Sequence, residues 1–103
     1  MGTVEAVIVE KLEQAFSPSH LEVLNESASH TVPQGSESHF KVVLVTDQFR
    51  NKSAVKRHQA VYAVLAEQLQ QSVHALALHT YTVSEWSQRE SAPKSPDCAG
   101  NRR

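Results

Sequence analysis

Histidine is the residue type in this chain that is best suited to chemistry. The 103 residues include six histidines but only one cysteine, Cys98. A neutral imidazole is the commonest protein ligand for metals, whereas a lone cysteine forms neither an internal disulfide nor a multi-cysteine zinc or iron–sulfur site. A metal centre built on this chain would therefore be an open half-site of imidazoles that takes its other ligands from elsewhere.

Three of the histidines are expected to meet at one edge of a sheet. His30 lies in the loop that joins the first two predicted strands, and His39 and His74 begin the second and third. A helix is predicted between the second and third strands, so these strands are parallel and begin at the edge where the loop lies. Two histidines replace two cysteines on one iron of a Rieske cluster, but hydrogen bonding to backbone or water is the alternative for each. The other histidines fit packing or solvent exposure: His20, His58 and His79.

The middle of the chain carries a local excess of positive charge. The formal net charge is −1, which excludes a wholly basic nucleic-acid coat. Residues 47–66 nevertheless carry four basic side chains against one acidic one. The four lie around a turn that leads into a helix: Arg50, Lys52, Lys56 and Arg57. A cationic helix entrance suits DNA phosphates, and a solvated basic face or a docking face for an acidic protein is the alternative.

No constellation typical of an enzyme is present. The sequence contains no G-x-S-x-G nucleophile elbow, no P-loop and no G-x-G-x-x-G motif. Cys98 lies in a predicted tail, with no fixed base to activate its thiol. We therefore expect no catalytic residues and a function in binding.

Hydrophobic periodicity and turn residues define the elements that must position these groups. The predicted elements are a helix over 3–16, strands over 20–27 and 38–46, a helix from 53 to about 71, a strand over 73–81 and a short helix after it. Thr3 and Ser53 are expected to cap their helices, and Thr82 with Glu85 forms a capping box. The long helix has one expected apolar stripe, made of Val55, Val61, Tyr62, Leu65 and Leu69, and an early break before Arg57 is an open alternative.

This order of elements predicts an α+β sandwich. The first two strands are joined by a loop of about ten residues, which suits an antiparallel pair. The result is a three-stranded mixed sheet with helices on one face. We expect one domain over 1–90 and a disordered tail over 91–103, which has no periodicity and is rich in proline, serine and charge. Because the chain shows neither a signal peptide nor a membrane span, a cytoplasmic protein is expected.

Three segments closely resemble BolA proteins: GSESHFKVVLVTDQF, VKRHQAVYAVLAEQL and VHALALHTYT. The resemblance covers about residues 3–90. It implies a class II KH-like fold, α-β-β-α-α-β-α, and a partnership with a monothiol glutaredoxin. The two proteins would share a [2Fe–2S] cluster with glutathione, and the isolated chain would hold no cofactor. The family's ligands correspond to His74 and His30, and nearby His39 would support them by hydrogen bonding without binding the cluster itself.

The resemblance also implies an alternative function. Some bacterial BolA proteins are transcription regulators that are linked to stress and morphology and bind promoter DNA through a helix-turn-helix-like region. That region corresponds to about residues 49–65, which contain the basic cluster. Many relatives have glycine in the turn where this chain has Arg50-Asn51-Lys52, and asparagine tolerates the left-handed backbone that such a turn needs. The chain has no G-x-x-G loop, which argues against RNA binding of the KH type.

Overall fold

The computed structural model describes residues 2–27 and 37–91. Its elements are α1 (Thr3–Phe16), β1 (His20–Asn25), β2 (His39–Val45), the short 3-10 helix η2 (Asp47–Phe49), α2 (Ala54–Val64), α3 (Ala66–Gln71), β3 (Ala75–Tyr81) and α4 (Val83–Ser91). The predicted order is confirmed. The break in the long helix falls at Leu65, where φ is −102° and ψ is 19°, and not before Arg57. The predicted tail over 91–103 lies, from residue 92 on, outside the described residues.

The three strands form one mixed sheet in the order β1-β2-β3. β1 and β2 are antiparallel, with His20 opposite Val45, while β2 and β3 are parallel, with His39 opposite Ala75. Both pairings are as predicted. β2 is the central strand, and its residues from 42 to 45 are buried on both faces, which explains why its sequence is a continuous apolar run.

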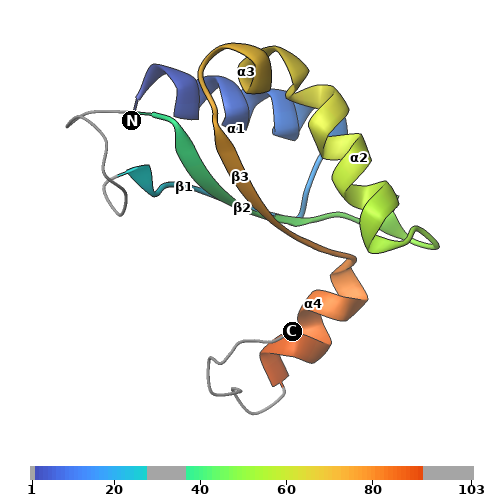
Figure 1. Cartoon of the computed structure of the whole chain (residues 1–103). Coiled ribbons are helices and arrows are strands. Elements are labelled where there is room, and N and C mark those ends of the chain that lie inside the picture. Colours follow the sequence, from blue (N-terminus) through green and yellow to red (C-terminus); the bar gives the residue numbers. More distant parts are fainter. Residues whose placement is uncertain (1, 28–36, 92–103) are drawn as a thin grey trace.

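The core lies between one face of the sheet and helices α1 to α3. Alternate side chains of β2, among them Val42 and Leu44, pack there against Ile8 and Leu12 of α1 and Val61 of α2. Figure 1 shows α1, α2 and α3 above the sheet and α4 below it. The predicted placement of helices on one face thus holds for the first three helices, and α4 covers one end of the opposite face.

Helix α2 buries only part of the predicted apolar stripe. Val61 and Leu65 are buried as expected, but Val55 and Tyr62 are 65% and 41% exposed. Arg57 is buried one turn before Val61, because positions i and i+4 of a helix share a face. In the first turn of α2, the charged Arg57 is therefore buried, whereas Val55, which the apolar stripe predicted to be buried, is exposed.

Two of the predicted caps are confirmed and one is wrong. Ser53 Oγ accepts a hydrogen bond from the Lys56 amide at 3.2 Å, and the Thr82 capping box also forms. Thr3 does not cap α1, whose cap position is Gly2. The carboxylate of Glu37 accepts hydrogen bonds from the amides of residues 4 and 5 at 3.3 and 3.1 Å. A negative charge from a distant segment thus stabilises this helix end.

The turn after β2 has the backbone that its asparagine predicts. Asn51 has a φ of 64°, in the left-handed region, and it separates the buried Phe49 from Lys52.

Over residues 2–27 and 37–91, no helix is long and apolar enough to cross a membrane.

Candidate functional site

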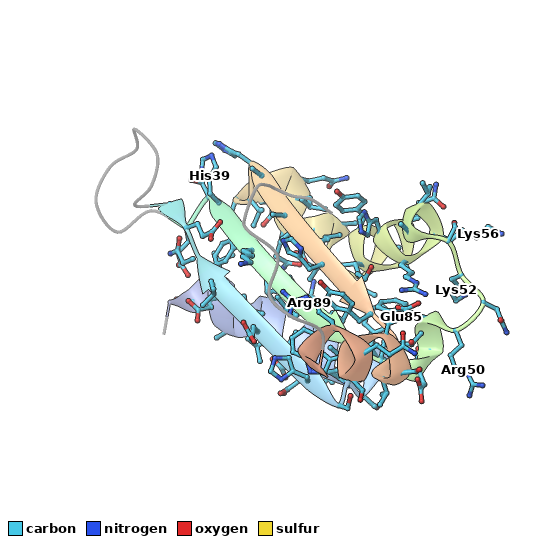
Figure 2. All side chains as sticks on the ribbon, turned by 90° about the horizontal axis from the view of Figure 1, so that it is seen from below. His39, Arg50, Lys52, Lys56, Glu85 and Arg89 are labelled. Carbon is cyan, nitrogen blue, oxygen red and sulfur yellow. The ribbon has the colours of Figure 1, made fainter. Side chains whose placement is uncertain are left out.

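His39 and His74 lie beside each other at one edge of the sheet. Their ring centres are 6.4 Å apart and their planes are inclined by 68°. His39 begins β2, and His74 precedes β3, whose parallel pairing brings the two strand starts together. The amides of His74 and Ala75 both donate to the Ser38 carbonyl, at 2.8 and 3.1 Å. The predicted convergence is therefore confirmed for these two histidines, and Figure 2 shows His39 at this edge.

Two serines hold this edge in place. Ser27, which is 3% exposed, accepts hydrogen bonds at its Oγ from the amides of Ser38 and His39, at 3.0 and 3.1 Å. The Ser38 hydroxyl lies 2.8 Å from Nδ1 of His39 and so orients the ring. A hydrogen bond at one ring nitrogen is typical of histidines that bind metals. No motif in the sequence marks these serines, although both flank the histidine-bearing loop.

The donors at this edge fit half of a metal site. The ring of His74 is exposed and that of His39 is half-buried. Within the described ranges, no group of three His, Cys, Asp or Glu side chains is arranged to hold a metal ion. The predicted ligand His30 lies outside the described residues, as does Cys98. The exposed His74, with His39 beside it, suits a nitrogen ligand of a mixed-ligand cluster whose other ligands come from outside the described residues and from a partner.

The other histidines have structural surroundings. His20 packs on α4, which covers this end of the sheet: its ring stacks on Trp86 with ring centres 4.8 Å apart, and its Nε2 lies 2.6 Å from the Glu22 carboxylate. His58 is half-buried in α2, and His79 is exposed on β3.

The predicted basic surface is smaller than its sequence suggests. Arg50, Lys52 and Lys56 are exposed at the turn and at the start of α2, and Figure 2 shows their side chains at one end of the molecule. Arg57 is only 9% exposed. Its contact with DNA stays a prediction, which this burial disfavours. We call the remaining three residues the basic turn.

Arg57 joins three segments from inside the fold. Its Nε donates to the Lys52 carbonyl at 3.0 Å, and its Nη1 donates to the Thr80 carbonyl at 3.3 Å. The two Nη atoms also donate to the two carboxylate oxygens of Glu85, at 2.7 and 3.0 Å. The guanidinium lies 5.7 Å from the centre of the Phe49 ring. We call these contacts the Arg57 clip. The spacing of Arg57 to Val61 places both on one face of α2, but the sequence alone does not show that this face holds partners for a charge.

Glu85 is both a helix cap and the anion of the clip. Its Oε1 accepts a hydrogen bond from the Thr82 amide at 2.9 Å, and its own amide donates to the Thr82 hydroxyl at 3.2 Å. The hydrogen bond from Arg57 is the main cause that lowers the pKa of Glu85 from 4.5 to about 2, and the Thr82 amide and the charge of Arg57 add to it against the effect of burial. The carboxylate therefore stays ionised through mildly acidic pH.

This low pKa predicts an acid-dependent loss of stability. Because the folded pKa lies below the unfolded one, ionised Glu85 stabilises the fold above about pH 4.5, and this contribution disappears as the pH falls toward 2. The side chain is 46% exposed, so screening by solvent limits the contribution to about 1 kcal/mol. Urea unfolding at pH 2–6 should show a smaller acid-induced loss for Glu85→Gln than for the wild type. Glu10→Gln, on the surface of α1, should keep the wild-type profile, and coincident profiles for all three proteins would contradict the prediction.

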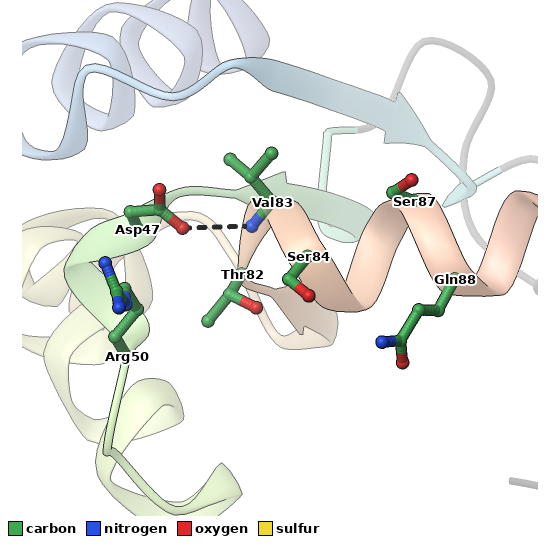
Figure 3. A pocket seen from close by; sticks show the side chains of 7 residues that line it. All are labelled: Asp47, Arg50, Thr82, Val83, Ser84, Ser87 and Gln88. Carbon is green, nitrogen blue, oxygen red and sulfur yellow. Dashed lines mark hydrogen bonds between the residues drawn. The ribbon is translucent and has the colours of Figure 1, made fainter.

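An open groove of about 580 Å³ lies between the basic turn and α4. Asp47, which lines it, accepts a hydrogen bond from the Val83 amide at 3.2 Å, as Figure 3 shows. The groove is lined by Asp47, Arg50, Thr82, Val83, Ser84, Ser87 and Gln88. An acidic and a basic residue both line it, so its charge is mixed, unlike that of the basic turn.

Comparison with known proteins identifies the family. The model of the BolA-like protein family matches residues 12–85, which is most of the described fold. The chain belongs to the BolA-like family. This BolA-like chain is 54% identical over 94 residues to the DNA-binding transcriptional regulator BolA of Escherichia coli, and the alignment covers 90% of each protein.

Solved structures agree with this assignment. The solution structure of mouse BolA1 is 46% identical to this BolA-like chain, with a TM-score of 0.81, over 97% of this chain and 81% of that one. The BolA domain of SufE1 from Arabidopsis thaliana is 38% identical, with a TM-score of 0.78, over 82% of this chain and 98% of that one. The α+β fold is therefore that of BolA proteins.

Proposed function

We propose that this chain is a non-enzymatic BolA-type regulator that pairs with a monothiol glutaredoxin and shares a [2Fe–2S] cluster with it. The observation that carries the proposal is the pair of His39 and His74 at one sheet edge, without a third ligand in the described part of the chain. Such an edge suits a cluster only if a partner supplies thiolates. The glutaredoxin cysteine and glutathione would be those thiolates, in iron–sulfur trafficking or in iron or redox sensing.

The histidines have different roles in this proposal. His74 and His30 bind the cluster, and His39 orients His74 or the cluster from beside it. Neutral imidazoles in place of thiolates make the cluster less negative, which raises its reduction potential. Ser27 and Ser38 fix the backbone from which His39 and His74 emerge. These hydrogen bonds fix the two strand starts relative to each other.

Reconstitution of the complex tests the ligand assignment. The chain is mixed with a monothiol glutaredoxin, glutathione, iron and sulfide, and the visible spectrum and cluster lifetime are recorded. We expect His74→Ala and His30→Ala each to abolish the mixed-ligand spectrum. His39→Ala should keep this spectrum and weaken cluster retention about 10- to 100-fold, as is usual for residues that support ligands.

His79→Ala is the matched control, because His79 is an exposed histidine within β3. It should leave both the spectrum and the lifetime unchanged. If His74→Ala and His30→Ala also left both unchanged, the ligand assignment would be wrong.

A second candidate function is DNA binding by a transcription regulator. The observation that favours it is the basic turn, where Arg50, Lys52 and Lys56 are exposed at the start of α2. The Escherichia coli relative is named as a DNA-binding transcriptional regulator. Side chains of this kind bind phosphates and fix the register of a protein on DNA. A role in stress response and cell morphology would be exerted through this surface.

Salt dependence tests the basic turn as a DNA-binding surface. Three phosphate contacts predict that the logarithm of the affinity for a promoter duplex falls with the logarithm of the salt concentration with a slope of about −2.7. Lys52→Gln and Lys56→Gln should each reduce the magnitude of this slope by about 0.9. Lys41→Gln, in β2, is the control and should keep the wild-type slope. Specific binding that is indifferent to Lys52 and Lys56 would exclude this surface.

A further inference from the structure

We propose that Arg57 is a positioning residue for DNA binding: it holds the basic turn in its binding conformation through Lys52 and Glu85, without touching the DNA. The inference rests on the second proposed function, because it concerns the turn that would meet the phosphates. The sequence placed Arg57 among the DNA contacts, and its geometry instead gives it this indirect role.

The guanidinium has little capacity left for an external ligand. The Arg57 side chain is 11% exposed. Four of its five N–H donors are used by the Lys52 carbonyl, the Thr80 carbonyl and the two oxygens of Glu85. A phosphate would have to displace these internal partners to reach it.

The basic turn is anchored on both sides by the Arg57 clip. On one side, Phe49 is fully buried and lies beneath the guanidinium. On the other side, the Lys52 carbonyl accepts the hydrogen bond from Arg57 Nε, while the Lys52 amide donates to the Phe49 carbonyl at 3.1 Å. Arg50 and Asn51 lie between these anchors. Their directions therefore depend on where Arg57 holds Lys52.

The backbone of the basic turn is also expected to change conformation when the contacts of the Arg57 clip are lost. Asn51 has a left-handed backbone with a φ of 64°. Asparagine tolerates this conformation, but in an unrestrained turn it also adopts the right-handed and extended regions. Loss of the hydrogen bond to the adjacent Lys52 carbonyl would free the turn to adopt other conformations and would misalign Arg50 and Lys52.

Replacement of Glu85 distinguishes a positioning role of Arg57 from direct DNA contact, because the two roles predict opposite changes in DNA affinity. Its carboxylate fixes the fork of Arg57, and the capping box fixes the carboxylate. Glu85→Gln removes a negative charge, so simple electrostatics predicts tighter binding to DNA. If Arg57 touched DNA, release from its ion pair would also tighten binding. Positioning predicts the opposite result, because the freed guanidinium no longer holds Lys52.

The experiment compares the wild type with Arg57→Lys, Glu85→Gln and Glu10→Gln. The last is the matched control, because it removes a surface charge on α1 outside the clip. Binding to a promoter duplex is measured at fixed salt, at a temperature where circular dichroism shows every variant to be folded. We expect Arg57→Lys and Glu85→Gln to weaken binding about tenfold, the loss expected from misaligned phosphate contacts. Glu10→Gln should bind as the wild type or slightly more tightly.

A second measurement uses the free proteins. Amide NMR shifts of residues 50–52 should change in Arg57→Lys and Glu85→Gln and stay unchanged in Glu10→Gln. Tighter or unchanged DNA binding by Glu85→Gln, or wild-type binding by Arg57→Lys, would overturn the proposal, as would unchanged amide shifts. If the wild type itself did not bind DNA, the DNA-binding function would fail, and the amide shifts alone would decide whether Arg57 holds the turn.

Discussion

Replacement of Phe49 by alanine is expected to destabilise the fold by about 3–5 kcal/mol, the usual cost of removing a buried aromatic ring. Phe49 is 0% exposed, and its ring centre lies 5.4 Å from that of Phe16 at the end of α1. The Arg57 guanidinium also lies over it. Its loss would leave a cavity where α1, the turn and α2 meet. In a domain of this size, the melting temperature should fall by more than about 10 °C.

Urea unfolding and calorimetry measure this effect. Val55→Ala is the matched control, because Val55 is a nearby apolar residue that is 65% exposed, and it should cost less than about 0.5 kcal/mol. A loss below about 1 kcal/mol for Phe49→Ala would mean that the turn is not anchored in the core.

Replacement of Arg57 by methionine is the second large expected effect, at about 2–3 kcal/mol. Methionine keeps an apolar stem over Phe49 but donates no hydrogen bonds. The carbonyls of Lys52 and Thr80 and the carboxylate of Glu85 would then lose their shared donor. The cost stays below that of breaking a fully buried ion pair, because the Glu85 side chain is 46% exposed and keeps part of its hydration.

A double-mutant cycle separates the ion pair from the other contacts. The free energies of unfolding of Arg57→Met, Glu85→Gln and the double variant are compared with that of the wild type. We expect a coupling energy of about 1 kcal/mol or more, as for groups in direct contact. Lys56→Met, at the exposed neighbouring position, should change stability by less than about 0.5 kcal/mol. Strict additivity would show that the Arg57–Glu85 contact contributes nothing to stability.

The local sequence determined the elements and their connections. Apolar periodicity gave the strands, and Ser53 and the Thr82 capping box marked the starts of α2 and α4, because these signals act over a few residues. A long helix between two strands requires a parallel crossover. That rule alone brought His39 and His74 to one edge, where the structure places them 6.4 Å apart. The position of His30 and its role stay predictions.

Only the tertiary structure decided which charged side chains point inward. Arg57 looks like its neighbour Lys56 in the sequence, yet Lys56 is exposed and Arg57 is buried. Burial of a charge is tolerated only where partners satisfy it, and here they come from Lys52, Thr80 and Glu85, which meet only after β3 and α4 have packed. The cap that Glu37 provides for α1 likewise depends on a contact between segments that are distant in the sequence. Local patterns therefore determined the helices, the strands and the edge with His39 and His74. Contacts between distant segments decided which basic side chains stay exposed and can bind a ligand.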